Sequence, residues 1–183
     1  TLLTQPERSG TPGRANSMLV ENLGPTFEGL RQDVAVPEPG EPVRITVSVD
    51  DPDGVASVSV YSAVDGAEAS EQPMTEEAAG RWSAELAGVD AGSIVQFYLE
   101  AVDSRGAVAV FPAAGEDSRA LFTADDGLAA TNGLHNLRIL MTPADSDWLH
   151  EDVNLMSNDR VGATVVYNES EVFYDVGIRL KGS

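Results

Sequence analysis

Apolar residues alternate with polar ones along much of the chain. Residues 43–49 carry valine or isoleucine at every second position, and the alternation returns at residues 55–64. A period of two is typical of strands with one buried and one solvated face. Turn residues such as Asp, Pro, Gly and Ser separate these runs. The same pattern predicts four more strands, at residues 81–86, 93–102, 107–111 and 119–123.

These short strands, without a helical period among them, predict an antiparallel β-sandwich over residues 25–125. The sandwich is Ig-like or fibronectin-like only in the broad sense, because the chain has no cysteine for an inter-sheet disulfide. Three prolines between residues 37 and 42 make the run before them an edge strand or an extended lead-in, since proline cannot donate to a sheet. Residues 65–80 are polar and are predicted as a long loop, with Met74 returning to the core.

The pattern changes after residue 125. A strand is predicted at residues 137–141, and Thr142 with Pro143 then begins a helix, threonine as the cap and proline at the first position. The helical spacing ends near residue 157. Two further strands, at residues 163–167 and 172–180, are joined by a hairpin turn.

The chain is accordingly mainly β and divides into three parts. Residues 1–24 are rich in turn-forming residues and are predicted as a linker or the end of a preceding domain. Residues 126–183 form a β-α-β-β segment that is too short for a good core of its own, so it is expected to be an incomplete α+β domain. We expect residues 130–183 to lean on the sandwich, to be covered by the remainder of the polypeptide or by another protein chain, or to be poorly ordered.

Charge excludes two classes of partner. Among 183 residues, 30 are acidic and 11 are Lys or Arg, for a formal net charge of −19. Such a surface repels phosphate backbones and anionic lipid headgroups, so we expect neither a nucleic-acid partner nor binding to a membrane surface. No apolar run reaches the roughly 20 residues of a membrane-spanning helix, so no membrane-spanning segment is expected.

Four aspartates mark a candidate metal site. Asp50, Asp51 and Asp53 crowd one inter-strand turn, and Asp103 lies in another. In a sandwich these two turns lie at the same end, so the carboxylates can converge, and several carboxylate oxygens are what Ca²⁺ requires. The alternative is that they are ordinary turn residues, because Asp-Gly turns are common without a metal.

No catalytic residue is predicted within the chain. His135 and His150 are the only histidines, and without cysteine or an HExxH spacing they are more typical of packing or capping than of zinc ligation. There is no Gly-x-Ser-x-Gly motif and no phosphate-binding glycine loop of the known patterns.

Two stretches resemble known families. Residues 9–17 (SGTPGRANS) resemble the end of bacterial lamin-tail-like domains. Residues 137–183 are similar to the start of the CotH family of spore-coat-protein-H-like atypical protein kinases, above all at residues 163–168 (ATVVYN) and 176–183 (VGIRLKGS). The region before them, with residues 95–98 (VQFY) and 101–103 (AVD), looks like the Ig-like spacer found ahead of CotH modules in large secreted bacterial proteins.

The CotH resemblance implies a protein that binds ATP with Mg²⁺ and transfers phosphate to serine. In that family the acidic metal ligands and the catalytic base lie downstream of the turn at Gly182 and Ser183, so none can be assigned to this chain. Lys181 occupies a position where the family also uses arginine, so the resemblance does not imply that it is a dedicated nucleotide-binding lysine. Arg179 and Gly182 match the family motif, and we interpret them as structural residues. The resemblance also implies an extracellular or cell-surface location in a bacterium.

Two functions stay open at this point. The chain is either a non-catalytic accessory or spacer region that includes the first elements of a CotH-like domain, or a structural or adhesive extracellular sandwich module with no kinase role, either with or without stabilisation by Ca²⁺. The coding sequence that follows Ser183 would distinguish them, because a kinase needs further Lys-, Asn- and Asp-containing motifs and a scaffold needs another sandwich.

Overall fold

The structure is a computed structural model that describes residues 21–129 and 135–181. The resemblance at residues 9–17 and most of the linker predicted at residues 1–24 lie outside the described residues. The same holds for Gly182 and Ser183.

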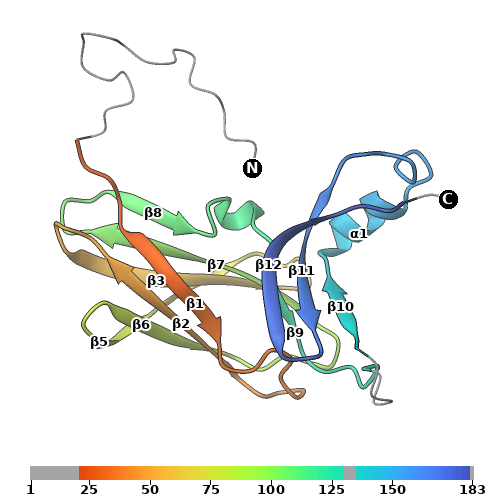
Figure 1. Ribbon diagram of the computed structural model, residues 1–183. Coiled ribbons are helices and arrows are strands. Elements are labelled where there is room, and N and C mark those ends of the chain that lie inside the picture. The colour runs from red at the N-terminus through yellow and green to blue at the C-terminus, as the bar shows by residue number, and fades with distance from the viewer. Residues whose placement is uncertain (1–20, 130–134, 182–183) are drawn as a thin grey trace, which may run out of the picture.

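Two antiparallel sheets face each other, which confirms the predicted β-sandwich (Figure 1). The first sheet has the order β1 (Thr26–Gln32), β2 (Val43–Asp50), β6 (Arg81–Leu86) and β5 (Thr75–Ala78). The second has the order β4 (Ser70–Pro73), β3 (Val55–Val64), β7 (Ile94–Asp103) and β8 (Val108–Phe111). β9 (Ala120–Thr123) also pairs with β7, on the edge that β8 occupies further along, and the short 3-10 helix η1 (Gly115–Asp117) lies between β8 and β9 in the chain.

The core lies between the two sheets and consists of the inward-facing residues of each alternating strand. β2 buries every second residue from Val43 to Val49, and β3 buries Val58 and Val60. Phe97 and Phe122 lie in the centre with ring centroids 6.2 Å apart. Burial of this alternating set is what fixes the register of the strands, because a slip by one residue would turn every apolar side chain to solvent.

The prediction of one long loop over residues 65–80 is wrong. Two short strands, β4 and β5, lie there, and they belong to different sheets. Met74 sits between them, is buried, and donates its N–H to the carbonyl of Val58. Both strands are exposed edge strands, so their residues are polar and lack the apolar alternation that identifies a half-buried strand.

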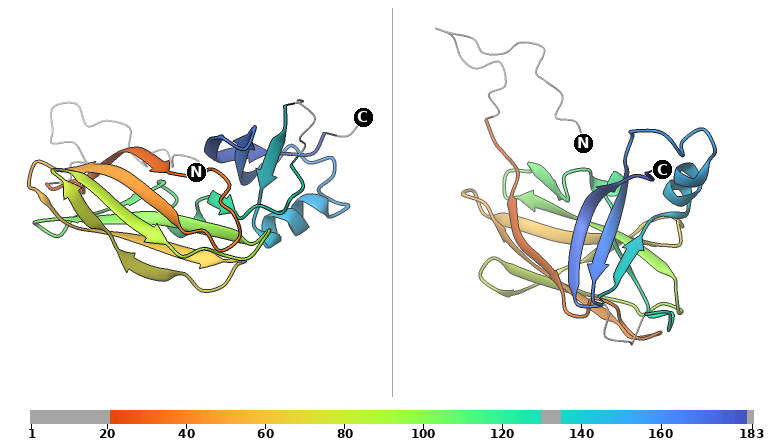
Figure 2. Two further views of the ribbon diagram at one scale, coloured as in Figure 1. Left: turned by 90° about the horizontal axis from the view of Figure 1, so that it is seen from below. Right: turned by 45° about the vertical axis from the view of Figure 1, so that its right-hand side comes forward.

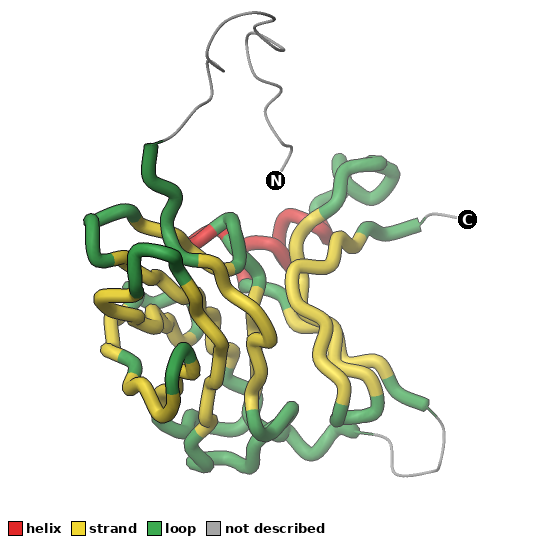
Figure 3. The backbone as a smooth tube through the Cα atoms, turned by 60° about the vertical axis from the view of Figure 1, so that its left-hand side comes forward, coloured by secondary structure: helices red, strands yellow, loops and turns green. Residues whose placement is uncertain are grey.

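Residues 137–178 form a second, smaller sheet with one helix, in the predicted β-α-β-β order. The order in the sheet is β10 (Leu137–Leu140), β11 (Val161–Tyr167) and β12 (Glu171–Ile178), all antiparallel, and we refer to it as the small sheet. Figure 3 shows it standing beside the sandwich, and Figure 2 shows the same arrangement from two other directions. No helix among the described residues is long and apolar enough to cross a membrane.

The helix α1 (Pro143–His150) begins as predicted but ends earlier. The side-chain oxygen of Thr142 accepts the N–H of Asp145, and Pro143 occupies the first turn. The predicted end near residue 157 is wrong, because the carbonyl of Trp148 accepts the side-chain amide of Asn154 and the N–H of Glu151. These bonds close the last turn.

Candidate functional site

Three of the four predicted aspartates come together at one end of the sandwich. Asp51 and Asp53 lie in the turn between β2 and β3, and Asp103 ends β7. One carboxylate oxygen from each lies within 4.8 Å of the others. Asp50 lies outside this group, because it is the last residue of β2 and falls on the exposed side of that strand. The three together, which we call the aspartate cluster, form an acidic group that could bind a metal ion.

Protein groups already use these carboxylates. Asp103 is buried and accepts the N–H groups of Arg105 and Ala107 at 2.8 Å, while its other oxygen accepts the side-chain amide of Asn22 at 2.6 Å. The guanidinium of Arg105 bonds Asp53 at 3.1 Å, and Asp51 accepts the N–H of Asp53. The cluster therefore also closes the two turns, and a cation bound here would compete with Arg105.

The pKa of Asp103 follows from these contacts. Burial acts to raise the pKa of this carboxyl, but the donors on Ala107, Asn22 and Arg105 outweigh it and hold the pKa below its ordinary value. Because the folded pKa is the lower one, the carboxylate stabilises the fold fully above the unfolded pKa of about 3.9. This contribution is lost as the pH falls through the folded pKa.

Replacing Asp103 by asparagine should reduce the acid sensitivity of the fold. We expect Asp103→Asn to unfold at a lower temperature than the wild type at about pH 7, and to lose less stability between about pH 5 and pH 3. Thermal unfolding followed by circular dichroism at these pH values measures both effects. The exposed Asp90→Asn is the matched control and should keep the wild-type pH dependence. If Asp103→Asn kept the wild-type pH dependence, the Asp103 carboxylate would not be the group that stabilises the fold above its pKa.

The histidines have protein partners and take no part in the aspartate cluster. The Nδ1 of His135 lies 2.7 Å from the hydroxyl of Tyr167, and the two rings are stacked with centroids 5.4 Å apart. His150 lies at the end of α1, where its Nδ1 is 2.7 Å from the carbonyl oxygen of Ser146. Both contacts fit packing and capping roles.

The small sheet is joined to the sandwich through β9. Phe122 of β9 points into the sandwich core, whereas Leu121 points the other way and packs against Leu140 and Val166 of the small sheet. The hydroxyl of Thr164 on β11 accepts the N–H of Leu121 at 2.9 Å. All four residues of β9 are buried for this reason, and the structure shows the predicted leaning of the second segment on the sandwich.

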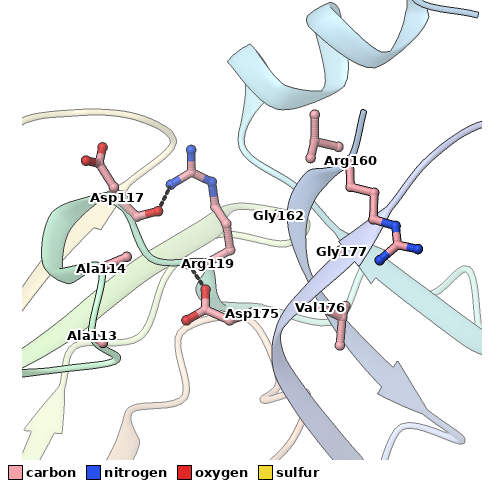
Figure 4. A pocket seen from close by; sticks show the side chains of 10 residues that line it. Ala113, Ala114, Asp117, Arg119, Arg160, Gly162, Asp175, Val176 and Gly177 are labelled. Carbon is pink, nitrogen blue, oxygen red and sulfur yellow. Dashed lines mark hydrogen bonds between the residues drawn. The ribbon is translucent and has the colours of Figure 1, made fainter. Parts of the chain in front are cut away.

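Arg119, just before β9, holds three elements together. Its N–H and carbonyl bond Asp175 of β12, and its guanidinium pairs with Asp145 of α1. A hollow of about 500 Å³ lies beside it, and Figure 4 shows Arg119 and Arg160 lining it together with Gly162 and Gly177. A Cβ on Gly162 would lie 2.6 Å from the Cγ of Arg119, so only glycine lets the arginine cross β11 here. Arg119 is thus engaged within the protein.

Tyr174 of β12 reaches into the sandwich. Its ring meets Phe97 edge-on with centroids 5.7 Å apart, and its hydroxyl donates to the side-chain oxygen of Gln32 at 2.6 Å. Burial raises the pKa of this phenol above its ordinary value, so the hydroxyl stays protonated and remains a donor. Tyr174 therefore fixes β12 to both sheets of the sandwich.

Arg138 of β10 ties the end of the sandwich to the small sheet. Only 12% of its side chain is exposed, and its guanidinium lies 2.9 Å from Asp126 and 3.0 Å from Glu169. Asp125 is a weaker third partner at 3.5 Å. Burial acts to lower the pKa of Arg138, but the bonds to Glu169 and Asp126 outweigh it and raise the pKa, so the group stays charged.

Removing this cation should weaken the junction. We expect Arg138→Met to lower the free energy of unfolding by about 2 kcal/mol, because it leaves Asp126 and Glu169 half-buried without their partner. Urea unfolding midpoints measure the loss. Arg81→Met, at an exposed position of β6, is the control and should stay within about 0.5 kcal/mol of the wild type. A loss no larger than that of the control would show that these ion pairs do not stabilise the junction.

The outer face of the small sheet, opposite Leu140 and Val166, is apolar and open. Cross-strand partners share a face, so the registers Ile139 with Val165 and Val165 with Phe173 place these three side chains together. Ile139 and Phe173 are each 49% exposed. A hollow of about 650 Å³ continues from this face toward α1, with Ile139, Leu149 and Ile178 among its lining residues.

Comparisons with known proteins add little to this geometry. Neither the family models nor the curated proteins contain a match to the chain. A solved structure described as "Crystal structure of Br derivative BhCBM56" is similar over 44% of this chain and 83% of its own, with 16% sequence identity and a TM-score of 0.34. This score is too low to support an argument about function.

Proposed function

We propose that this chain is a non-catalytic accessory or spacer region of a secreted, CotH-like bacterial surface protein, and that the small sheet belongs to the first part of the kinase-like fold. One observation supports the proposal most strongly. Leu137, Ile139 and Phe173 remain between 49% and 65% exposed on one sheet face. Solvated sheet faces normally carry polar side chains, and a contiguous apolar patch marks an interaction surface. The remainder of the polypeptide, or another protein chain, docks on this face.

The charges around the neighbouring hollow fit a docking segment with acidic residues. Arg160 and Arg179 both line the hollow, whereas the chain as a whole carries a net charge of −19. Opposite charges at the rim of an interface favour encounter and fix its register. An acidic segment with aliphatic anchors therefore matches this surface better than a basic one.

We assign no catalytic step to the residues of this chain. ATP and Mg²⁺ belong to the part of a CotH-like protein that lies downstream. The purified chain, incubated with radiolabelled ATP and Mg²⁺, should show only background incorporation into itself or an added serine peptide. Phosphate transfer above background would overturn the proposal.

The docking surface can be tested with single cysteines, because the chain has none of its own. In the isolated chain, Ile139→Cys should react quickly with a thiol reagent and Leu140→Cys slowly, since Ile139 is 49% exposed and Leu140 only 5%. In the polypeptide encoded by the whole gene, reaction at Ile139→Cys should slow at least tenfold. Val64→Cys, on the sandwich, is the control and should react equally in both. Equal reactivity of Ile139→Cys in both would contradict docking on this face.

A second candidate function is a structural or adhesive surface module that Ca²⁺ stabilises. The observation that favours it is the convergence of the aspartate cluster within 4.8 Å. A bound ion stabilises the folded state by mass action, about 2.7 kcal/mol at a hundredfold excess over Kd. Melting temperatures measured in Ca²⁺ and in EGTA test this function. A higher melting temperature in Ca²⁺, lost in Asp53→Asn, supports it, and equal melting temperatures in Ca²⁺ and EGTA exclude it.

A further inference from the structure

Two tyrosines form an aromatic platform on the outer face of the second sheet of the sandwich. Tyr61 of β3 and Tyr98 of β7 are direct cross-strand partners. Their rings are parallel within 2°, with centroids 4.8 Å apart. Val60 and Leu99, their neighbours along the strands, are fully buried, so the two tyrosines lie on the opposite, solvent side of the sheet. Because the parallel rings stack on each other, they cover each other's inner faces, and the outer face of each half-buried ring is what remains for a ligand.

The stacked pair lines a hollow with a fixed wall. The hollow has a volume of about 250 Å³. Gln96, also on β7, donates its side-chain amide to the carbonyls of Glu116 and Ser118 at 2.8 and 2.7 Å. These bonds hold η1 over the sheet, so that Glu116 and Asp117 line the hollow. Small residues, Ala67 and Ala69, line it as well and leave its space open.

The surroundings of the rings are anionic. Burial first, and then the carboxylates of Glu100 and Glu71, raise the pKa of Tyr61. Burial, followed by Glu116 and Glu100, raises the pKa of Tyr98. No basic side chain is among the described residues that line the hollow. Arg119 lies nearby, but its guanidinium is engaged by Asp145 and by the carbonyl oxygens of Asp117 and Ser118.

We propose that this hollow binds an organic cation, an alkylammonium or guanidinium group, against an outer ring face of the stacked Tyr61–Tyr98 pair, with Glu116 and Asp117 balancing its charge. The face of an aromatic ring is its negative side and attracts cations within about 6 Å, and nearby carboxylates add to that attraction. A neutral sugar could also stack on tyrosine, but it would gain nothing from the surrounding carboxylates. The inference does not depend on the proposed docking at the small sheet.

The cation can come from a basic peptide or from a free polyamine, and the experiment separates these sources. The intact chain is titrated calorimetrically at low salt with spermidine, with a short arginine- and lysine-containing peptide, and with the same peptide carrying citrulline and norleucine instead. A neutral glucan oligosaccharide is a fourth probe. We expect binding of one or both cationic probes and none of the neutral ones. Binding of the peptide but not of spermidine identifies a protein partner. Binding of both the peptide and spermidine shows that the cationic group is what the hollow recognises in each.

Variants then assign the binding to the platform. Tyr98→Leu should weaken binding of the cationic probe about five- to tenfold, whereas Tyr98→Phe should keep it, since phenylalanine retains the ring face. Glu116→Gln with Asp117→Asn should weaken binding and reduce its salt dependence. Glu28→Gln, which removes one exposed carboxylate from β1 of the other sheet, is the control and should change nothing.

Three results would overturn the proposal. The first is cation binding that Tyr98→Leu leaves unchanged, which would indicate unspecific attraction to an acidic surface. The second is binding of the glucan in preference to the cations, which would make the platform a sugar site. The third is no binding of any probe. Melting temperatures of the variants within a few degrees of the wild type separate loss of the ligand from loss of the fold.

Discussion

Replacing Tyr174 by alanine is expected to lower the free energy of unfolding by about 3 kcal/mol, in the range for truncation of a large aromatic side chain in a core. The ring packs edge-on against Phe97 at the centre of the sandwich, and its hydroxyl bonds Gln32 of β1. Alanine would leave a cavity next to Phe97 and would remove the donor to the side-chain oxygen of Gln32, whose amide nitrogen stays bonded to the carbonyls of Val34 and Ala35. Because Tyr174 belongs to β12, the effect should include loosening of the whole small sheet.

Chemical denaturation of the alanine and phenylalanine variants separates the contribution of the Tyr174 ring from that of its hydroxyl hydrogen bond. Tyr174→Phe keeps the ring contact and loses only the hydrogen bond, so it should cost about 1 kcal/mol. A loss in Tyr174→Ala no greater than that in Tyr174→Phe would mean that the ring contributes little, and that β12 is only loosely placed against the sandwich.

Leu121→Ala is the second change from which we expect a large effect, a loss of about 3 kcal/mol. Leu121 is fully buried between β9 and the small sheet, where it packs against Leu140 and Val166. The lost methyl groups would leave a cavity that the two sheets cannot close, because β9 is held to β7 on the sandwich side.

Unfolding in urea, followed by tryptophan fluorescence and by circular dichroism, measures this loss. Trp82 lies in the sandwich and Trp148 in α1, so fluorescence reports on both parts. Leu128→Ala, at a site that is 82% exposed, is the matched control and should stay near the wild type. A stability of Leu121→Ala equal to that of the control would show that the junction contributes nothing to the fold.

The strands whose faces differ in burial were predictable from the sequence. β2, β3 and β7 alternate between an apolar and a polar face, and a period of two is enough to place them. β4 and β5 were not predictable, because both of their faces are wet and carry polar residues. The end of α1 was missed for a different reason. Val153 continues the helical spacing but is 82% exposed, so no packing extends the helix.

Most contacts between distant segments could not be predicted from the sequence. The convergence of Asp51, Asp53 and Asp103 is an exception, because it follows from the sandwich topology, which puts both turns at one end. Asp50 lies outside the group because β2 extends to this residue and turns its side chain to the exposed face. A strand boundary at the level of one residue could not be predicted from the sequence. The pairing of Tyr61 with Tyr98 and the contact of Tyr174 with Phe97 depend on register and on docking, neither of which a one-dimensional pattern contains.

β9 is buried on both faces, and we expect it to join the sandwich and the small sheet into one cooperative unit. Amide hydrogen exchange of the Leu121 N–H tests this coupling, because this group is bonded to the Thr164 hydroxyl across the junction. Leu121 should exchange as slowly as the amides of β7, through unfolding of the whole body. Exchange at Leu121 about a hundredfold faster than in β7 would mean that the small sheet opens on its own, and the two parts would then not be one cooperative unit.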